Sequence, residues 1–366
     1  MDNARNMERL KKIAKSFNLK GDIATIEPLG NGLINDTFIV KTEAAGTPDY
    51  VLQRINTQIF TNVEVLQRNI EAVTRHIRMK LTERGTDDID RRVLTFLNTP
   101  SGRTYTVDDE GCCWRMSVFI ANSHTLDIVD CNSAKSCGKA FGEFESLLAD
   151  IPDTLGETIP RFHDMELRAA QLDEAIHNDV AGRLHEVEEE VAVIEDMADD
   201  MCRAEQLHRK GMLPKRICHC DTKVNNMLVD DNGNVLCVID LDTVMPSYVF
   251  SDYGDFLRTA ANTAAEDEPD LSKVCFREDI FQSFTEGYIG ATASFLTKTE
   301  RQNLPFAVAL FPYMQATRFL TDYLNGDTYY KTAYDQHNLV RTRNQLELLR
   351  QILERMAKIE KFIASI

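Results

Sequence analysis

The sequence predicts an α+β protein of two parts, in which a small β-rich part is followed by a larger helical part. Short segments rich in β-branched and aromatic residues gather in the first third of the chain, whereas longer segments with apolar residues at helical spacing dominate afterwards. The chain has 366 residues, which is enough for two domains. We therefore expect one domain over 1–120 and a second over 121–366.

The N-terminal part combines strand patterns with two helical patterns. Apolar residues three and four positions apart predict helices over 7–18 and 62–82. Runs of β-branched residues separated by turn residues predict strands over 23–29, 37–42, 50–55, 92–97, 103–108 and 114–121. These elements describe a small β-rich lobe that leads into a connector near 120–125.

The C-terminal part shows mainly helical periodicity. The predicted helices are 134–150, 166–180, 182–210, 277–288, 298–325 and 339–364. The helix over 182–210 carries many acidic residues opposite its apolar stripe, which we interpret as a solvent-exposed face rather than a cation site. A short β pattern over 217–242 interrupts the helices.

The charge balance argues against a general nucleic-acid partner. The chain has 41 Lys and Arg residues against 58 Asp and Glu residues, a formal net charge of −17, whereas nucleic-acid binding needs a basic face. An acidic protein that handles an anionic nucleotide usually needs a divalent cation between the two charges.

Other features of the composition favour a cytoplasmic protein without a membrane partner. The longest apolar stretch, 306–314, is far shorter than the ~20 residues that span a bilayer, and the start lacks an apolar signal core. The nine cysteines include no C-x-x-C pair, so we expect free thiols in a reducing compartment. Three adjacent residues do not readily turn onto one metal, so 218–220 is a poor zinc candidate. The sequence gives no basis for an oligomeric state.

The segment richest in chemistry has the pattern H-x-D-x-x-x-x-N, from His219 through Asp221 to Asn226. A turn at 231–233 and an apolar run follow, and the run ends at Asp240. Phosphoryl transfer requires a carboxylate that takes or orients the acceptor hydroxyl, and oxygen ligands that hold Mg²⁺. Asp221 is therefore the candidate base, and Asn226 and Asp240 are candidate metal ligands at one end of a predicted hairpin. The alternative is a surface turn in which these residues occur by chance, with His219 supporting the loop.

A glycine turn lies upstream, between the first two predicted strands. Gly30 and Gly32 would let backbone N–H groups approach phosphates, although a plain hairpin is the alternative. A strand follows these glycines, so the turn is not a dinucleotide-binding fingerprint. The chain also lacks the G-x-x-x-x-G-K-[ST] motif of P-loop proteins.

At these residues the chain resembles the protein-kinase-like small-molecule phosphotransferases, the aminoglycoside phosphotransferase and choline kinase group, and it is most similar to N-acetylhexosamine 1-kinases. The resemblance covers nearly the whole chain, and its motifs are 219–226, 239–246, 252–255, 265–268, 318–324 and 337–343. It implies a protein kinase-like bilobal fold, with ATP and Mg²⁺ in a cleft between the lobes. It also implies transfer of the γ-phosphoryl group to the anomeric hydroxyl of a hexosamine (GlcNAc or GalNAc).

The resemblance assigns a role to individual residues. Asp221 is implied to be the base, and Asn226 and Asp240 the Mg²⁺ ligands. The residues implied to bind the nucleotide are Gly30, Gly32, Gln53, Ile120 and Asn122, and those implied to contact the sugar are Leu33, Asp221, Thr243, Arg318 and Tyr329. Two simpler interpretations stay open, because Arg318 could pair with Asp322 at i,i+4 and Tyr329 could be a surface aromatic residue.

Two departures from the family pattern matter for function. Gln53 stands near the position of the lysine that usually grips the phosphates, and its helix partner falls near Asn69 or Glu71, so that a charged pair could have become a neutral one. Arg54 is a possible substitute, although it should point to the other face of the sheet. Leu33 stands where the sugar kinases suggest a histidine near the substrate, which affects the choice of sugar.

Three other functions require residues that can be compared with this sequence. A protein kinase is disfavoured because Cys220 replaces the loop arginine and 240–242 lacks the D-F-G glycine. An aminoglycoside- or choline-type kinase remains an alternative, as does a nucleotide-binding pseudokinase. Gln53 favours the pseudokinase, whereas the intact Asp221, Asn226 and Asp240 oppose it.

Overall fold

A computed structural model describes residues 2–30 and 34–366 of the chain. The chain forms two compact units. The first unit contains Met1–His124, Asp150–Pro160 and Leu228–Met245, and the second contains Thr125–Ala149, Arg161–Met227 and Pro246–Ile366. The predicted α+β class is confirmed, because the first unit is built on an antiparallel sheet and the second is mostly helical. The predicted domain boundary at residue 120 does not separate these two compact units, because 150–160 and 228–245 also belong to the first unit. It remains a prediction about the functional lobes.

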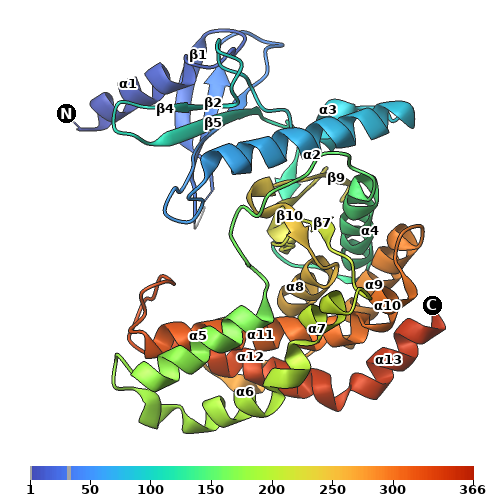
Figure 1. The fold of residues 1–366 in the computed structure, drawn as a ribbon. Coiled ribbons are helices and arrows are strands. Elements are labelled where there is room, and N and C mark those ends of the chain that lie inside the picture. The colour runs from blue at the N-terminus through green and yellow to red at the C-terminus, as the bar shows by residue number, and fades with distance from the viewer. Residues whose placement is uncertain (1, 31–33) are drawn as a thin grey trace. The chain divides into compact units, whose positions relative to one another are not determined.

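A five-stranded antiparallel sheet forms the centre of the first unit (Figure 1). Its strands are β1 (Ile23–Pro28), β2 (Asp36–Thr42), β3 (Tyr50–Arg54), β4 (Tyr105–Val107) and β5 (Cys113–Val118), in the order β1-β2-β3-β5-β4. In this register Gln53 on β3 lies opposite Thr37 on β2 and opposite Arg115 on β5. The register therefore places these three side chains next to one another on neighbouring strands.

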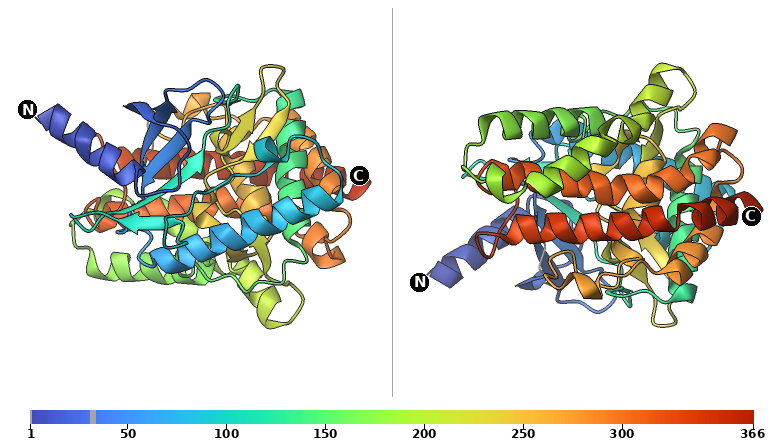
Figure 2. Two further views of the ribbon diagram at one scale, coloured as in Figure 1. Left: turned by 90° about the horizontal axis from the view of Figure 1, so that it is seen from above. Right: turned by 90° about the horizontal axis from the view of Figure 1, so that it is seen from below.

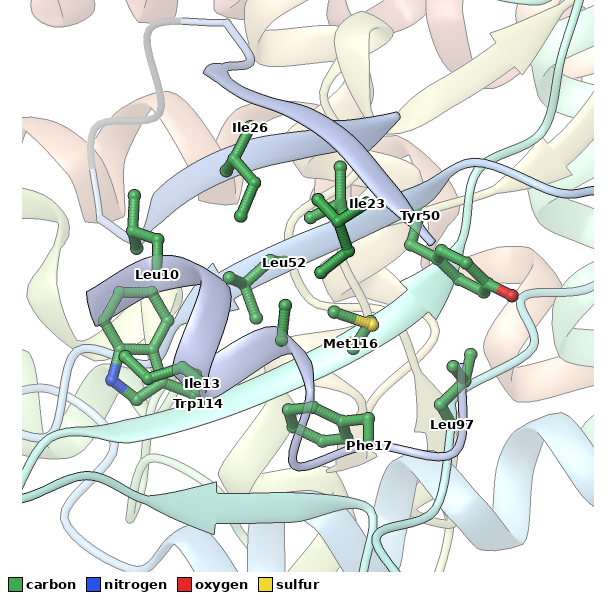
Figure 3. Close-up of a cluster of buried hydrophobic side chains, with 12 residues drawn as sticks. Leu10, Ile13, Phe17, Ile23, Ile26, Tyr50, Leu52, Leu97, Trp114 and Met116 are labelled. Atoms are coloured by element: carbon green, nitrogen blue, oxygen red, sulfur yellow. The ribbon is translucent and has the colours of Figure 1, made fainter. Parts of the chain in front are cut away.

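Three helices accompany the sheet in this unit: α1 (Asp2–Ala14), α2 (Val63–Glu83) and α3 (Ile89–Arg92). Leu10 and Ile13 of α1 are buried against Leu52 of β3 and Trp114 of β5, as Figure 3 shows. The three-residue spacing of Leu10 and Ile13 places both on one face of α1. Fully burying such a side chain contributes about 1.5–3 kcal/mol, so this cluster is the main apolar core of the unit.

A second, smaller sheet contains β6 (His124–Thr125), β8 (Met227–Val229) and β9 (Val235–Val238), in the order β6-β8-β9. The connection from β8 to β9 has five residues, which is too short for a parallel crossover, so the two strands form the predicted hairpin. Leu236 and Cys237 of β9 pack with Ile120 in a small apolar cluster, joined by Leu94, Leu228 and Ile239.

Helices dominate the second unit (Figure 1). They are α4 (Cys131–Leu148), α5 (Met165–Asn178), α6 (Glu188–Met201), α7 (Arg203–Arg209), α8 (Phe250–Ala260), α9 (Glu278–Thr292), α10 (Lys298–Gln302), α11 (Leu304–Leu324), α12 (His337–Glu354) and α13 (Met356–Ser365). Two short strands, β7 (Arg216–Cys218) and β10 (Met245–Ser247), pair with each other. The long helices α11 and α12 lie side by side, as the orange and red ribbons in the right view of Figure 2 show.

Glycines allow several helices of this unit to pack closely. A Cβ atom at Gly138 of α4 would lie 2.1 Å from the carbonyl oxygen of Phe284 in α9, and one at Gly287 of α9 would lie 2.1 Å from that of Lys135 in α4. Gly254 of α8 has the same role, because its Cβ would lie 2.5 Å from the carbonyl oxygen of Ala307 in α11. These contacts leave no room for a side chain, and they fix α8, which supports the loop discussed below.

Several element predictions were wrong in detail. The segment 92–97 begins with the last residue of α3, and it then runs beside β5 through one isolated bridge, Phe96 to Ser117, instead of a full strand. The predicted helix over 182–210 is divided into the 3-10 turn Leu184–Glu186 and the helices α6 and α7, which are separated at Cys202. Acidic residues in the first turn of α6 favour the helix start at Glu188. The predicted helix over 298–325 restarts at α11, where Pro305 occupies the first turn.

No helix within the described residues is long and apolar enough to cross a lipid bilayer.

Candidate functional site

The loop that carries Asp221 follows β7 in the second unit and is fixed by hydrogen bonds to α8. Both carboxylate oxygens of Asp252 accept backbone N–H groups, from His219 and from Cys220, each at 2.7 Å. The hydroxyl of Thr222 donates to the carbonyl oxygen of Asp252 at 2.8 Å. Cys220 has a φ of 62°, a left-handed conformation that is uncommon for a residue other than glycine. The bonds to Asp252 hold the chain in this turn.

Asp221 lies at the centre of a small polar group within this loop. The side-chain amide of Asn226 donates to the carboxylate of Asp221 at 3.1 Å and to its carbonyl oxygen at 2.8 Å. The ammonium group of Lys223 lies 2.8 Å from the same carboxylate. Burial lowers the pKa of Lys223, but the charge of Asp221 outweighs this effect and leaves the pKa raised, so Lys223 is positively charged. The carboxylate of Asp221 is therefore oriented by two donors.

A buried pair of acids lies behind the loop. Glu145 of α4, Cys218 of β7 and Asp252 of α8 are fully buried, and their potential ligand atoms lie within 4.8 Å of one another. Burial raises the pKa of Glu145 well above its usual range and also raises that of Asp252, although N–H groups partly offset the second effect. Tyr288 donates to Glu145 at 2.5 Å. Burial therefore disfavours the charged form of both acids, whereas the N–H groups of His219 and Cys220 favour the charged form of Asp252.

We expect Asp252→Asn to destabilise the second unit and to slow turnover. The amide group of asparagine would face an N–H donor, and a buried hydrogen bond to a charged group contributes about 1.5–3 kcal/mol. Thermal unfolding followed beside steady-state kinetics measures both effects. Asp173→Asn, on the exposed face of α5, is the matched control. A melting temperature equal to that of the wild type would contradict the support that we assign to Asp252.

Asp240 lies at the end of the β8–β9 hairpin in the first unit. It is exposed and has a φ of 58°, and the short helical turn Leu241–Thr243 follows it. Within that turn Asp242 and Thr243 are buried. Along the chain, Asn226 directly precedes β8 and Asp240 follows β9, so the hairpin begins and ends at the two predicted metal ligands.

The donor set at these two positions fits Mg²⁺ by its chemistry. Carboxylate and amide oxygens are the hard ligands that Mg²⁺ prefers. The nitrogen of the Asn226 side chain is used by Asp221, and within the described residues the oxygen of that amide accepts no hydrogen bond. The oxygen is therefore the atom that could bind a cation. The assignment of both residues to the metal remains a prediction.

The predicted nucleotide residues are described in part. Ile120 is buried in the apolar cluster of β9, and Asn122, with a φ of 52°, accepts a hydrogen bond from Arg91 at its carbonyl oxygen. Gly30 has a φ of 70°, which favours glycine, although the space around it would admit a side chain. Gly32 and Leu33 lie outside the described residues.

Gln53 and Asn69, one of the two pairings that the sequence leaves open, do not bond to each other. Gln53 donates to Thr37 at 3.2 Å and accepts from Arg115 at 3.0 Å, so both ends of its amide are used within the sheet. Asn69 instead bonds to backbone groups, namely the N–H and carbonyl oxygen of Gly156 and the carbonyl oxygen of Val244. The other candidate partner, Glu71, accepts a hydrogen bond from Thr104. Arg54 forms an exposed ion pair with Asp36.

Arg318 of α11 lies in a cluster of aromatic rings in the second unit. Its guanidinium carbon is 5.3 Å from the ring centre of Phe162, 5.6 Å from that of Tyr330 and 6.0 Å from that of Tyr329. It also donates to Gln315 at 3.2 Å. Tyr329 therefore lies beside Arg318, and the assignment of both residues to a sugar remains a prediction.

The alternative pair of Arg318 with Asp322 is not the one observed. Asp322 accepts hydrogen bonds from the backbone N–H groups of Thr328, Tyr329 and Tyr330, at 2.8–3.0 Å, and from the side chain of Asn338. Asp322 thus fixes the loop that carries both tyrosines. The motif residues 318–324 and 337–343 therefore meet in one structural unit around this loop.

A second arginine, Arg168, adds positive charge near the cluster. Burial, and after it the nearby charge of Arg318, lower the pKa of Arg168 to about 10. Arg168 donates to Gln171 and to the backbone carbonyl oxygens of Arg161 and Phe162. Sequence reasoning did not single out Arg168, because an isolated arginine in a helix gives no signal.

Known proteins match the chain across most of its length. A family model described as the phosphotransferase enzyme family matches residues 25–274. Among solved structures, an aminoglycoside phosphotransferase from Alicyclobacillus acidocaldarius has a TM-score of 0.61 at 11% identity, covering 97% of this chain and 96% of that one. Spectinomycin phosphotransferase in complex with ADP and spectinomycin has a TM-score of 0.57 at 14% identity, covering 97% and 98%. Amicoumacin kinase in complex with AMP-PNP and Ca²⁺ has a TM-score of 0.58 at 13% identity, covering 97% and 95%.

The solved structures share only 11–14% of their residues with this chain, so they show a common fold. They confirm the kinase-like α+β fold that the sequence predicts. The family model covers more than half of the 366 residues, including the loop of Asp221 and the turn of Asp240. The chain therefore belongs to the phosphotransferase enzyme family.

Proposed function

We propose that the chain is an ATP- and Mg²⁺-dependent small-molecule kinase that phosphorylates the anomeric hydroxyl of an N-acetylhexosamine to the sugar 1-phosphate. The family match supports phosphoryl transfer. Two related structures hold ADP, or AMP-PNP with Ca²⁺, which supports ATP and a divalent cation as the partners of this chain. The observation that carries the sugar assignment is the cluster of Arg318, Tyr329 and Tyr330 around Asp322.

In the proposed reaction Asp221 accepts the proton of the sugar hydroxyl as the hydroxyl oxygen attacks the γ-phosphorus of ATP. The bond from this phosphorus to the bridging oxygen breaks, and ADP leaves. Asn226 and Lys223 hold the carboxylate in one orientation through their hydrogen bonds, so no side-chain rearrangement is needed when the hydroxyl arrives. Asn226 and Asp240 would hold Mg²⁺, which when bound neutralises charge on the phosphates. Little covalent chemistry remains for the protein, whose part is to position the groups and to take one proton.

The sugar cluster suits a neutral, hydroxyl-rich acceptor. Aromatic rings can pack against the apolar face of a pyranose, while a guanidinium group donates hydrogen bonds to hydroxyl or acetamido oxygens. Tyr329 is 59% exposed, so its ring is available to a ligand.

The charges near this cluster disfavour a cationic acceptor. Arg168 and Arg318 lie close enough for each other's charge to matter, and like charges near a cationic substrate are repulsive. Their presence weakens the case for an aminoglycoside- or choline-type acceptor. Asp322, an acid of this segment, is occupied by backbone N–H groups.

We expect Arg318→Gln to raise the KM for the sugar by about 10- to 100-fold with little change in the KM for ATP, because a hydrogen bond to a charged group contributes about 1.5–3 kcal/mol. Initial rates at varied sugar and fixed saturating Mg·ATP measure the effect. Arg350→Gln, an exposed arginine of α12 that pairs with Glu347 and Glu354, is the control. An equal rise in both KM values would contradict a sugar-binding role for Arg318.

The position of phosphorylation can be tested directly on the product. A phosphate at the anomeric carbon is labile in mild acid and splits the signal of the anomeric proton in NMR spectra. We expect the product made from an N-acetylhexosamine to lose its phosphate in mild acid and to show a split anomeric proton signal. An acid-stable phosphate would mean that the enzyme uses another hydroxyl, and it would overturn the 1-kinase assignment.

A further inference from the structure

A buried ion pair lies within the first unit beside Gln53 of β3. Arg115 of β5 is 2% exposed, and it pairs with Asp242, whose side chain is 4% exposed. The Nε of Arg115 donates to the side chain of Gln53 at 3.0 Å. The ring of Phe96 lies 5.7 Å from the guanidinium carbon. Asp242 is the single acidic partner of Arg115 within the described residues.

This ion pair ties the sheet to the turn that follows Asp240. One carboxylate oxygen of Asp242 binds Arg115, and the other accepts a hydrogen bond from the side chain of Asn35 at 2.7 Å. Asn35 in turn accepts a hydrogen bond from the backbone N–H of Asn56 at 3.0 Å. Both oxygens of Asp242 are therefore used by partners that belong to the sheet and its loops.

A second contact holds the same turn two residues further along the chain. The side chain of Asn69 in α2 donates to the carbonyl oxygen of Val244 at 3.0 Å. The turn that begins at Asp240 is thus fixed at its third residue by Arg115 and at its fifth by Asn69. Asp240 itself is exposed and has a left-handed backbone, a conformation that persists when the surrounding structure holds it.

The stability of the fold does not by itself explain why Arg115 and Asp242 are buried as an ion pair. Removing two charges from water is costly, and apolar residues of similar size often stabilise a core as well or better. A buried pair does, however, fix one geometry, because its partners have few alternative positions. Arg115 bonds to both Asp242 and Gln53, so the orientation of its guanidinium group is set from two sides.

We propose that Arg115 is a positioning residue for the metal site, holding Asp240 in place through Asp242. The proposal rests on the proposed function in one respect, the role of Asp240 toward Mg²⁺. The side chain of Gln53 cannot take over this positioning role, because both ends of its amide are used by the hydrogen bonds to Thr37 and Arg115. Arg115 acts on the bound nucleotide through Asp242 and Asp240 rather than by contact.

The test measures binding of AMP-PNP by calorimetry across a range of Mg²⁺ concentrations, so that no turnover is needed. We expect Arg115→Met to raise the Mg²⁺ concentration needed for half-maximal binding by about 10- to 100-fold, as residues that orient metal ligands typically do. Arg115→Lys should restore part of the loss, because it keeps the charge toward Asp242 but not the bond to Gln53. Arg103→Gln, an exposed arginine just before β4, should match the wild type.

A purely structural role makes a different prediction. Arg115→Met would then lower the melting temperature and leave the Mg²⁺ dependence of binding unchanged, and that result overturns the proposal. If this variant does not fold, the double variant Arg115→Met/Asp242→Leu removes both buried charges, and we expect it to fold and still to need more Mg²⁺. A wild-type Mg²⁺ dependence in the double variant also overturns the proposal.

The failure of this inference can be told apart from failure of the proposed function. A wild-type protein that binds Mg·AMP-PNP but phosphorylates no sugar would contradict the proposed acceptor, while the comparison of Arg115 variants would still decide the positioning role. A wild-type protein whose AMP-PNP binding is independent of Mg²⁺ would overturn the inference, whichever acceptor is used.

Discussion

Replacing Asp221 with asparagine is expected to lower kcat by a factor of about 10²–10⁴ while nucleotide binding stays close to that of the wild type. Asparagine has nearly the same shape and can still bond to Asn226 and Lys223, but it cannot accept the proton of the attacking hydroxyl. The loss should therefore appear in the chemical step. Rapid-quench measurement of a single turnover, together with calorimetric binding of AMP-PNP, separates the two quantities.

Asp231→Asn provides the matched control for this substitution. Asp231 lies in the exposed turn of the β8–β9 hairpin, ten residues from Asp221 in the sequence, and its loss should leave turnover unchanged. Turnover near the wild-type level in Asp221→Asn would remove Asp221 as the base. Loss of AMP-PNP binding in that variant would instead indicate that the loop has lost its structure.

Replacement of Asp240 should have the second large effect, the loss of Mg²⁺-dependent activity. Asp240→Ala removes the proposed ligand, but alanine in a left-handed conformation adds a cost of about 1–2 kcal/mol. Asparagine tolerates that conformation, so Asp240→Asn removes the charge with less disturbance of the turn. For both variants we expect kcat/KM to fall by about 10²-fold or more at a Mg²⁺ concentration that saturates the wild type.

Titration with Mg²⁺ and with Mn²⁺ checks the metal assignment for Asp240. Partial recovery of activity at high metal concentration in Asp240→Asn would agree with a weakened ligand. Thermal unfolding of the same samples shows whether the turn remains folded. An unchanged metal dependence in either variant would contradict the assignment of Asp240 as a metal ligand.

The elements with regular periodicity could be predicted from the sequence. The strand β3 and the helix α2 show clear patterns, because each buries one face and leaves the other more exposed. The helix α8 gives no such pattern, since nearly all of its residues are buried, including Asp252 and Asp255. Hydrophobic periodicity arises from the contrast between a buried face and an exposed face, so a helix that is buried on all sides gives no periodic signal.

The part of the candidate site whose residues lie close together in the sequence could be predicted. Asp221 and Asn226 lie five residues apart in one loop and bond to each other, so the motif contains their geometry. Arg115 and Asp242 are 127 positions apart, and only the fold brings them together. The acids Glu145 and Asp252 were missed as a pair for the same reason, because each alone looks like an ordinary helix residue.

The choice of acceptor tests the central claim most directly. The measurement is ADP release from Mg·ATP with GlcNAc, GalNAc, glucose, galactose, mannose and ManNAc, beside choline and an aminoglycoside. We predict turnover with GlcNAc or GalNAc that exceeds turnover with the simple hexoses and is absent with the cationic acceptors. Turnover with choline or the aminoglycoside would contradict the proposed acceptor. So would the absence of turnover with every sugar while the nucleotide still binds.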